Sequence, residues 1–211
     1  CNTANGCLST VVNGTCNVAT GVRSFVGGGI RATVTAGTAS AIVGGQDNTS
    51  SGNYSFIGGG QCNTSTGLRS VLSGGFRNQT TNDYAVVAGG TTNIASGACS
   101  VISGGRFNCA VGVGSVIAGG DTQIVTGNSS AIVGGCNNTA ASTFTFIGGG
   151  RYHNASGCFS TIAGGCCNTS SGYFSGILGG SGNTTSANWS GAFGCNLTNT
   201  QPCTFMANNF V

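Results

Sequence analysis

The sequence predicts an all-β chain that folds as a parallel β-solenoid, with two short strands in each 15-residue coil. Three observations predict it. A serine recurs in steps of fifteen, a large aliphatic residue stands two places after it, and a Gly-Gly pair follows. Fifteen residues are too few for a strand and a helix, and 41 glycines among 211 residues argue against helix. The recurring serines are Ser9, Ser24, Ser40, Ser55, Ser70, Ser100, Ser115, Ser130, Ser160, Ser175 and Ser190.

Positions in the repeat are numbered from this serine, and Ala85 and Thr145 take its place in two repeats. One extra residue near Ala36 separates Ser24 from Ser40. The thirteen starts predict a solenoid of about thirteen repeats over residues 1–196. Residues 197–211 lack the pattern and are expected to form a C-terminal cap or the lead-in to a further domain.

The first strand is expected to place positions 1, 3 and 5 inward, which are serine, Ile or Val, and glycine. The second strand places positions 9 and 11 inward. Position 9 is mostly asparagine. The column of equivalent asparagines in successive coils is called the asparagine file. Stacked amides can bond the turn backbone from coil to coil, so the asparagine file is interpreted as structural. Glycine at positions 6 and 13 suits bends that a Cβ would obstruct.

Position 2 must face outward if position 3 faces inward, and it is largely apolar. Position 4 beside it is small or apolar. Together they predict a stripe longer than a soluble monomer normally leaves in water, and therefore self-association. The candidate interface residues are Phe25, Phe56, Val71, Val86, Val101, Val116 and Phe146.

The pattern Ser-x-Ile-x-Gly-Gly-x-x-Asn-x-Ala-x-Gly resembles the head repeats of YadA-like trimeric autotransporter adhesins and related haemagglutinin repeats, and similar repeat fibre proteins of giant viruses and phages. The resemblance covers roughly residues 1–196. It implies a left-handed β-roll, a homotrimeric rod, and a surface-exposed stalk or adhesive head that meets a host-surface receptor or glycan. The fifteen-residue step, where bacterial heads usually show fourteen, and the cysteines favour a viral or other fibre.

The charge of the chain argues against several functions. Six arginines and three aspartates give a net charge of +3, without a dense basic stripe for nucleic acid, and no apolar run is long enough for membrane insertion. The three aspartates fall at different repeat positions, so no carboxylate pair forms by stacking, and His153 replaces an asparagine at position 9. No enzyme activity, cofactor or metal is expected, since Cys-x-x-Cys and Gly-Gly-x-Gly-x-Asp are absent.

Twelve cysteines favour a disulfide-permissive compartment. Cys1 and Cys16 share position 8 of successive coils, which brings their Cα atoms within bridging range. A second candidate pair, Cys195 and Cys203, would close the last coil. The remaining cysteines are left open between interchain bonds and free thiols.

Three Asn-x-Ser acceptors stand apart from the asparagine file, because they occupy position 14 in a turn, where a sugar could project. They are the candidate glycosylation sites Asn53, Asn128 and Asn188.

Two functions follow from these patterns. The first is a structural or adhesive segment of an extracellular or virion-surface fibre, a trimeric stalk or head located outside the cell or on a virion or cell surface. The alternative is an ice- or crystal-binding β-solenoid that uses outward threonine and serine at positions 10 and 12, interrupted at Gln79, Ile94, Cys109 and Ile124. The outward pairs are Thr33/Thr35, Thr49/Ser51, Thr64/Thr66, Thr169/Ser171 and Thr184/Ser186.

Overall fold

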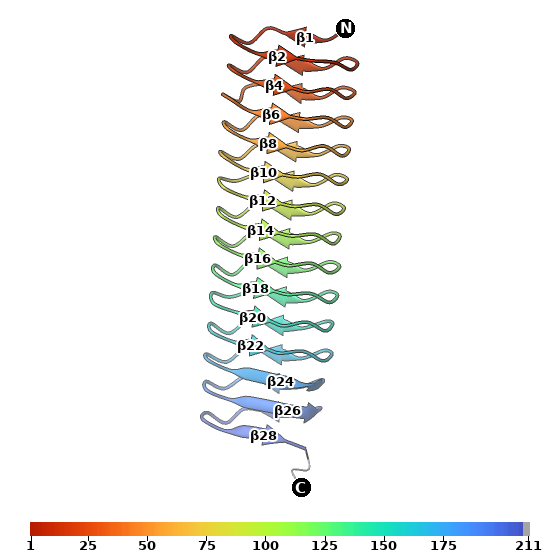
Figure 1. Cartoon of the computed structure of the whole chain (residues 1–211). Coiled ribbons are helices and arrows are strands. Elements are labelled where there is room, and N and C mark those ends of the chain that lie inside the picture. The colour runs from red at the N-terminus through yellow and green to blue at the C-terminus, as the bar shows by residue number, and fades with distance from the viewer. Residues whose placement is uncertain (209–211) are drawn as a thin grey trace. The chain divides into compact units, whose positions relative to one another are not determined.

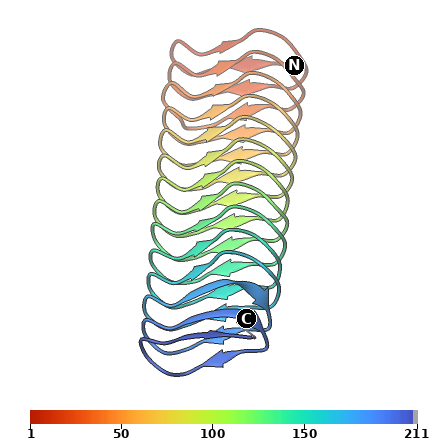
Figure 2. The ribbon, with the colours of Figure 1, turned by 60° about the horizontal axis from the view of Figure 1, so that its bottom comes forward.

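The computed structural model describes residues 1–208 and confirms the solenoid: this part of the chain is a parallel β-solenoid of about 14 turns that contains strands and no helix. It divides into two compact units, Cys1–Phe107 and Asn108–Val211. Within each unit, successive coils stack so that odd-numbered strands form one sheet and even-numbered strands the other (Figures 1 and 2). Residues 209–211 of the expected C-terminal segment lie outside the described residues.

In unit 1 both sheets contain seven two-residue strands. The odd sheet consists of β1 (Thr3–Ala4), β3 (Val18–Ala19), β5 (Thr33–Val34), β7 (Thr49–Ser50), β9 (Thr64–Ser65), β11 (Gln79–Thr80) and β13 (Ile94–Ala95). The even sheet consists of β2 (Thr10–Val11), β4 (Phe25–Val26), β6 (Ala41–Ile42), β8 (Phe56–Ile57), β10 (Val71–Leu72), β12 (Val86–Val87) and β14 (Val101–Ile102).

Unit 2 repeats this arrangement, and its last even strands are longer. The odd sheet consists of β15 (Cys109–Ala110), β17 (Ile124–Val125), β19 (Thr139–Ala140), β21 (Asn154–Ala155), β23 (Thr169–Ser170), β25 (Thr184–Thr185) and β27 (Thr198–Asn199). The even sheet consists of β16 (Val116–Ile117), β18 (Ala131–Ile132), β20 (Phe146–Ile147), β22 (Thr161–Ile162), β24 (Gly176–Ser181), β26 (Gly191–Cys195) and β28 (Phe205–Ala207). The two sheets thus continue beyond residue 196.

The strands of neighbouring coils pair in register, as Val71 does with Val86. Two coils depart from the fifteen-residue step. Phe25 pairs with Ala41 because the extra residue falls in the turn near Ala36, as expected from the sequence. At the other end Gly191 pairs with Phe205, one residue fewer, after a register shift between Ile177 and Gly179.

The core is a set of files that run from coil to coil. Position 3 is fully buried, as at Ile57, and so is position 11 on the facing strand, as at Ser65. The serines at position 1 and the asparagines at position 9 are buried as well, so these inward assignments are confirmed. The inward assignment of position 5 was wrong: a Cβ built on Gly59 meets no atom within 4 Å, because that residue already belongs to the turn.

The first turn, positions 5–8, is braced by the asparagine file. Asn63 Nδ2 donates to the carbonyl of Gly59 in its own coil (3.0 Å) and to that of Gly75 in the next coil (2.9 Å), while its Oδ1 accepts the N–H of Asn78 (2.9 Å). Each amide therefore bonds the backbone of the following coil rather than its neighbouring side chain. The glycine at position 6 has a left-handed backbone, with φ of 82° at Gly60, which suits glycine.

The second turn, positions 13–15, is braced mainly within its own coil. Ser70 Oγ donates to the carbonyl of Gly67 (2.8 Å) and pairs with Ser65 Oγ (2.6 Å). Position 13 is glycine in most coils, and a Cβ on Gly67 would overlap the carbonyl of Asn82 in the next coil. Asn82, Ser142 and Ala187 occupy this position in three other coils. Position 15 has a left-handed backbone, and non-glycine residues such as Arg69 occupy it with φ of 53°.

Candidate functional site

The most extensive candidate surface is the apolar stripe on the outer face of the even sheet. Phe25, Phe56, Val116 and Phe146 at position 2 are 39–41 % exposed. Val71, Val86 and Val101 are partly exposed in the same file. The outward assignment of position 2 is therefore confirmed. In unit 1 the stripe continues from β4 to β14; in unit 2 it ends after Phe146, where position 2 becomes threonine and then glycine.

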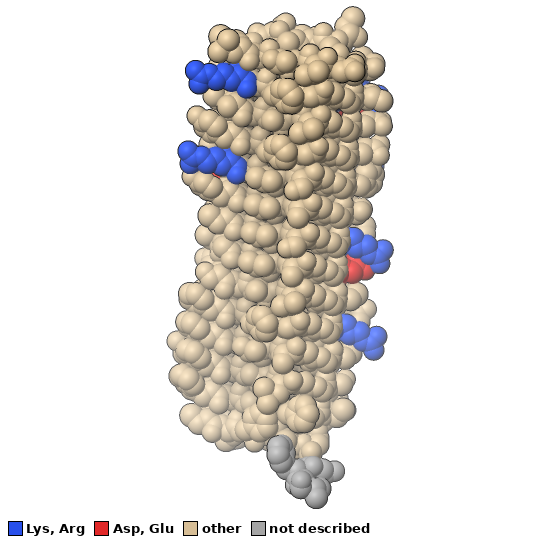
Figure 3. Space-filling view, in the orientation of Figure 1, with Lys and Arg blue, Asp and Glu red and all other residues tan. Residues whose placement is uncertain are grey.

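The charged side chains are confined to the turns. All six arginines and three aspartates occupy positions 7, 8, 14 or 15 of the repeat, and both outer sheet faces carry none. Figure 3 shows the charges at the margins of a broad uncharged face. Arg31 pairs with Asp47 across successive coils (Nε–Oδ1 2.5 Å), and this hydrogen bond lowers the pKa of the Asp47 carboxyl. Their exposure makes the pair a minor contributor to stability.

The outer face of the odd sheet carries the hydroxyl pairs. Thr49 and Ser51 are partly exposed, while Thr35 and Thr66 at position 12 are exposed. The pairs form a run over β5, β7 and β9 in unit 1 and over β23 and β25 in unit 2. Gln79 and Ile94 end the first run, and the exposed Ile124 lies in unit 2.

The second turn of unit 2 carries an aromatic ladder. Phe144, Phe159, Phe174 and Trp189 occupy position 15 of four successive coils and stack with centroid separations of 4.8, 4.5 and 4.4 Å. Tyr173 packs edge-on against Phe174 and Trp189. In unit 1 the same file contains Tyr54, Arg69 and Tyr84, where the guanidinium lies over both rings at 5.7 and 5.6 Å. Sequence reasoning missed the ladder, although four aromatics in steps of fifteen were the signal for it.

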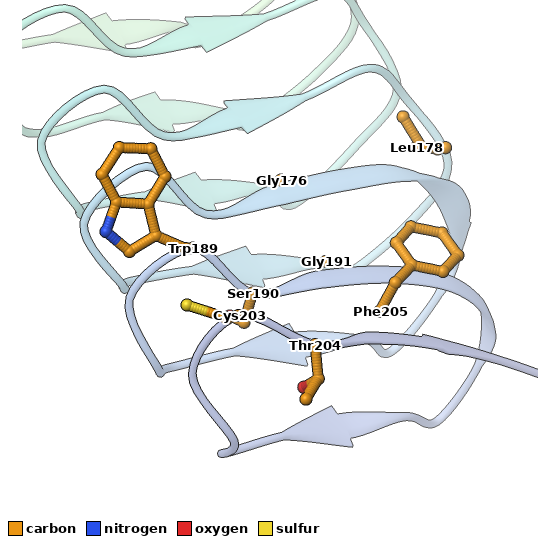
Figure 4. A pocket seen from close by; sticks show the side chains of 8 residues that line it. All are labelled: Gly176, Leu178, Trp189, Ser190, Gly191, Cys203, Thr204 and Phe205. Carbon is orange, nitrogen blue, oxygen red and sulfur yellow. The ribbon is translucent and has the colours of Figure 1, made fainter.

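A hollow of about 320 Å³ lies beside the end of the ladder. It exists because position 2 is glycine at Gly176 and Gly191, so the stripe loses its side chains there. Trp189 stands on one side, and Leu178 and Phe205 on the other (Figure 4). The hydroxyls of Ser190 and Thr204 beside it donate to backbone carbonyls, of Ala187 and Gln201 respectively.

His153 is part of the asparagine file. It is 1 % exposed, and its Nδ1 accepts the N–H of Asn168 (3.1 Å), which is the bond that an asparagine Oδ1 makes elsewhere. Its Nε2 has no hydrogen-bond partner. Burial lowers the pKa of the imidazole, which keeps the ring neutral.

All twelve cysteines have free thiols, and no pair lies at bonding distance. The Cys1–Cys16 and Cys195–Cys203 bridges are thus not formed in this structure. Cys1 and Cys16 are both exposed at the same repeat position. Cys195 is the last residue of β26, on the side of the first turn, whereas Cys203 lies in the second turn, so that pair sits at opposite ends of the coil.

The asparagines at position 14 are exposed and have a structural role of their own. The Oδ1 atoms of Asn53, Asn128 and Asn188 accept the N–H of the equivalent residue one coil earlier, at 2.9, 2.9 and 3.0 Å. The attachment atom Nδ2 is not used in these bonds. The geometry is compatible with a sugar at each, and their glycosylation stays a prediction.

Within residues 1–208, no group of three or more His, Cys, Asp and Glu side chains is placed to hold a metal ion. The same residues include no helix that is long and apolar enough to cross a membrane. Compared with known proteins, the chain matches no family model and no curated protein.

Proposed function

We propose that the chain is a structural or adhesive segment of an extracellular or virion-surface fibre, and that it works as a homotrimer. The observation that carries the proposal is the stripe on the even sheet. Large apolar side chains are held in register on a face that contains no charge, and one coil has no further layer with which to cover them.

Three chains are proposed rather than two because of the resemblance of the repeat to trimeric adhesin heads, which also suggests left-handed coils. A closed ring of parallel copies keeps the stripes at the same height and leaves no open side for further stacking. A host-surface receptor or glycan is the partner that an adhesive role would require. No catalytic role is part of the proposal, because the aspartates and His153 occupy positions that the repeat uses for structure.

The oligomeric state tests the proposal directly. Sedimentation equilibrium of the purified chain at micromolar concentration is expected to give the trimer mass. Val116→Asp, which puts a charge into the stripe, should shift the equilibrium toward monomer. The matched control is Val113→Asp, since Val113 is 54 % exposed in the second turn, outside the stripe. A stable monomer, or equal effects of both variants, would contradict the proposal.

The second candidate, ice or crystal-face binding, is favoured by the hydroxyl pairs on the odd sheet. Three successive coils, β5, β7 and β9, present threonine at position 10 with a threonine or serine at position 12. A thermal-hysteresis measurement separates the candidates, because the fibre proposal predicts no hysteresis. If hysteresis appears, Thr49→Ala should reduce it, and Thr139→Ala, outside the runs, should not.

A further inference from the structure

A thiol cluster occupies the first turn of three successive coils in unit 2. Arg151, Cys166 and Ser181 stand at position 7 and form successive parallel bridges. Cys167 follows Cys166, and their sulfur atoms are 2.9 Å apart. Arg151 Nε donates to Cys166 Sγ at 3.3 Å. Cys166 is partly exposed and Cys167 exposed, so a reagent in solution can reach both.

The two thiols are chemically different. The pKa of Cys166 lies below its usual range, because the Cys167 thiol and then Arg151 donate hydrogen bonds to its sulfur. The pKa of Cys167 is raised, chiefly by that same contact with Cys166. A thiolate is the nucleophilic form of cysteine, and a neighbouring cation stabilises it. The site therefore has one activated sulfur beside a protonated one.

We propose that Cys166 and Cys167 form a redox-active dithiol, in which Cys166 is the nucleophile and Cys167 is the resolving thiol. The oxidant is a small-molecule disulfide of the glutathione class. The Cys166 thiolate attacks one of its sulfurs and forms a mixed disulfide, releasing one small thiolate. Cys167 loses its proton, attacks the Cys166 sulfur and releases the second small thiol. Two protein thiols are oxidised to one disulfide, and one small disulfide is reduced to two thiols.

The geometry makes this disulfide reversible. Adjacent residues have Cα atoms about 3.8 Å apart across a trans peptide, below the usual 4.4–6.8 Å of bridged cysteines. The backbone cannot easily relax, because Cys166 N–H bonds the Gly180 carbonyl (3.0 Å) and Cys167 N–H bonds the Arg151 carbonyl (2.9 Å). Strained and exposed disulfides are the readily reduced, regulatory kind. The pair is accordingly a modification site and not a permanent cross-link.

The test is exchange of the fully reduced chain with oxidised glutathione, followed by acid quenching, peptic digestion and mass mapping. The expected product is a peptide with Cys166 and Cys167 that has lost two hydrogens and regains them with dithiothreitol. In Cys167→Ser, glutathione should stay attached to Cys166, and in Cys166→Ser the exchange should slow by roughly tenfold. Both substitutions are conservative, and the unrelated thiol Cys62 serves as the internal rate standard.

Arg151→Gln tests whether Arg151 activates the Cys166 thiol. It should slow the modification of Cys166 several-fold, while Arg77→Gln, which removes an arginine that lies over Phe76 at 4.9 Å, should leave the rate unchanged. Three outcomes would overturn the proposal. These are Cys166 reacting no faster than Cys62, an unchanged rate in Arg151→Gln, or recovery of Cys166 only in interchain disulfides.

Discussion

The two turns of the coil are stabilised by different side-chain hydrogen bonds. In the first turn, the buried Asn63 makes three hydrogen bonds, two of which reach the next coil. In the second turn, the hydroxyl of Ser70 bonds its own coil only. The buried side chain of the first turn therefore couples coils, while the buried hydroxyl of Ser70 closes its own coil; exposed groups of the second turn, such as Asn53, also bond the neighbouring coil.

The exceptions in the sequence agree with this difference. The extra residue near Ala36 enters the second turn, and the strands on both sides keep their pairing. One residue is lost in β26, opposite the register shift between Ile177 and Gly179, and Leu197 then takes the place of the asparagine, so that the amide ladder ends there. The insertion is thus accommodated in the second turn, whereas the lost residue coincides with the end of the amide ladder.

The largest effect is expected from Asn63→Ala. It removes three hydrogen bonds: the carbonyl of Gly59 and the N–H of Asn78 lose their partner, and the carbonyl of Gly75 keeps only the N–H of Gln61, at a cost of about 3 kcal/mol in unfolding free energy. The matched control is Asn53→Ala in the second turn, whose exposed amide makes one backbone bond and should cost less than about 1 kcal/mol. Urea unfolding measures both, and equal costs would remove the distinction between the turns.

Gly67→Ala tests the second turn, and it is compared with a glycine substitution in the first turn. Its Cβ would overlap the carbonyl of Asn82, so we expect a loss of about 1–3 kcal/mol. Gly59→Ala in the first turn adds a Cβ in open space and should change stability by less than about 0.5 kcal/mol. Thermal unfolding of the two variants decides this. A clear loss of stability in Gly59→Ala would indicate that this residue faces the interior of the coil.

The third prediction concerns pH, through the one coil whose amide is replaced by imidazole. The pKa of His153 is lowered in the fold, so below about pH 6.5 the unfolded chain binds more protons and stability falls as the pH falls. The loss reaches up to about 1.4 kcal/mol one pH unit below that value. Amide hydrogen exchange at pH 7.5 and 5.5 should show it around β21 in the native chain. In His153→Asn the effect should vanish; its persistence would assign it to another group.

The smallest effect is expected at the serines of the second turn. Ser70→Ala removes two buried hydrogen bonds and should cost about 1 kcal/mol. Ser115→Ala should be neutral or slightly stabilising, because Ser115 Oγ is buried without a hydrogen-bond partner. Urea unfolding compares the two, and an equal loss would show that the hydroxyl bond is not the source of the Ser70 effect.

Much of the fold could be predicted from the sequence, because each repeat position has one environment in every coil. Ile117 and the serine before it are inward for the same reason as their equivalents, and a single period reveals them all. Position 5 was misplaced because alternation was extended past the strand, which ends at position 3, into the turn. Side-chain contacts between coils, such as the aromatic ladder and the Arg151–Cys166–Cys167 cluster, depend on rotamers in turns of left-handed backbone, which a periodic pattern does not specify.

The amide ladder has a consequence for how such a chain can change in length. Each asparagine bonds its own coil and the one that follows, so a coil has no such bond with the coil two places away. Deleting or duplicating fifteen residues therefore joins surfaces of the same kind, and each whole coil changes the stack by about 4.8 Å. Tandem duplication of a short gene segment can lengthen the molecule in equal increments without creating a new interface.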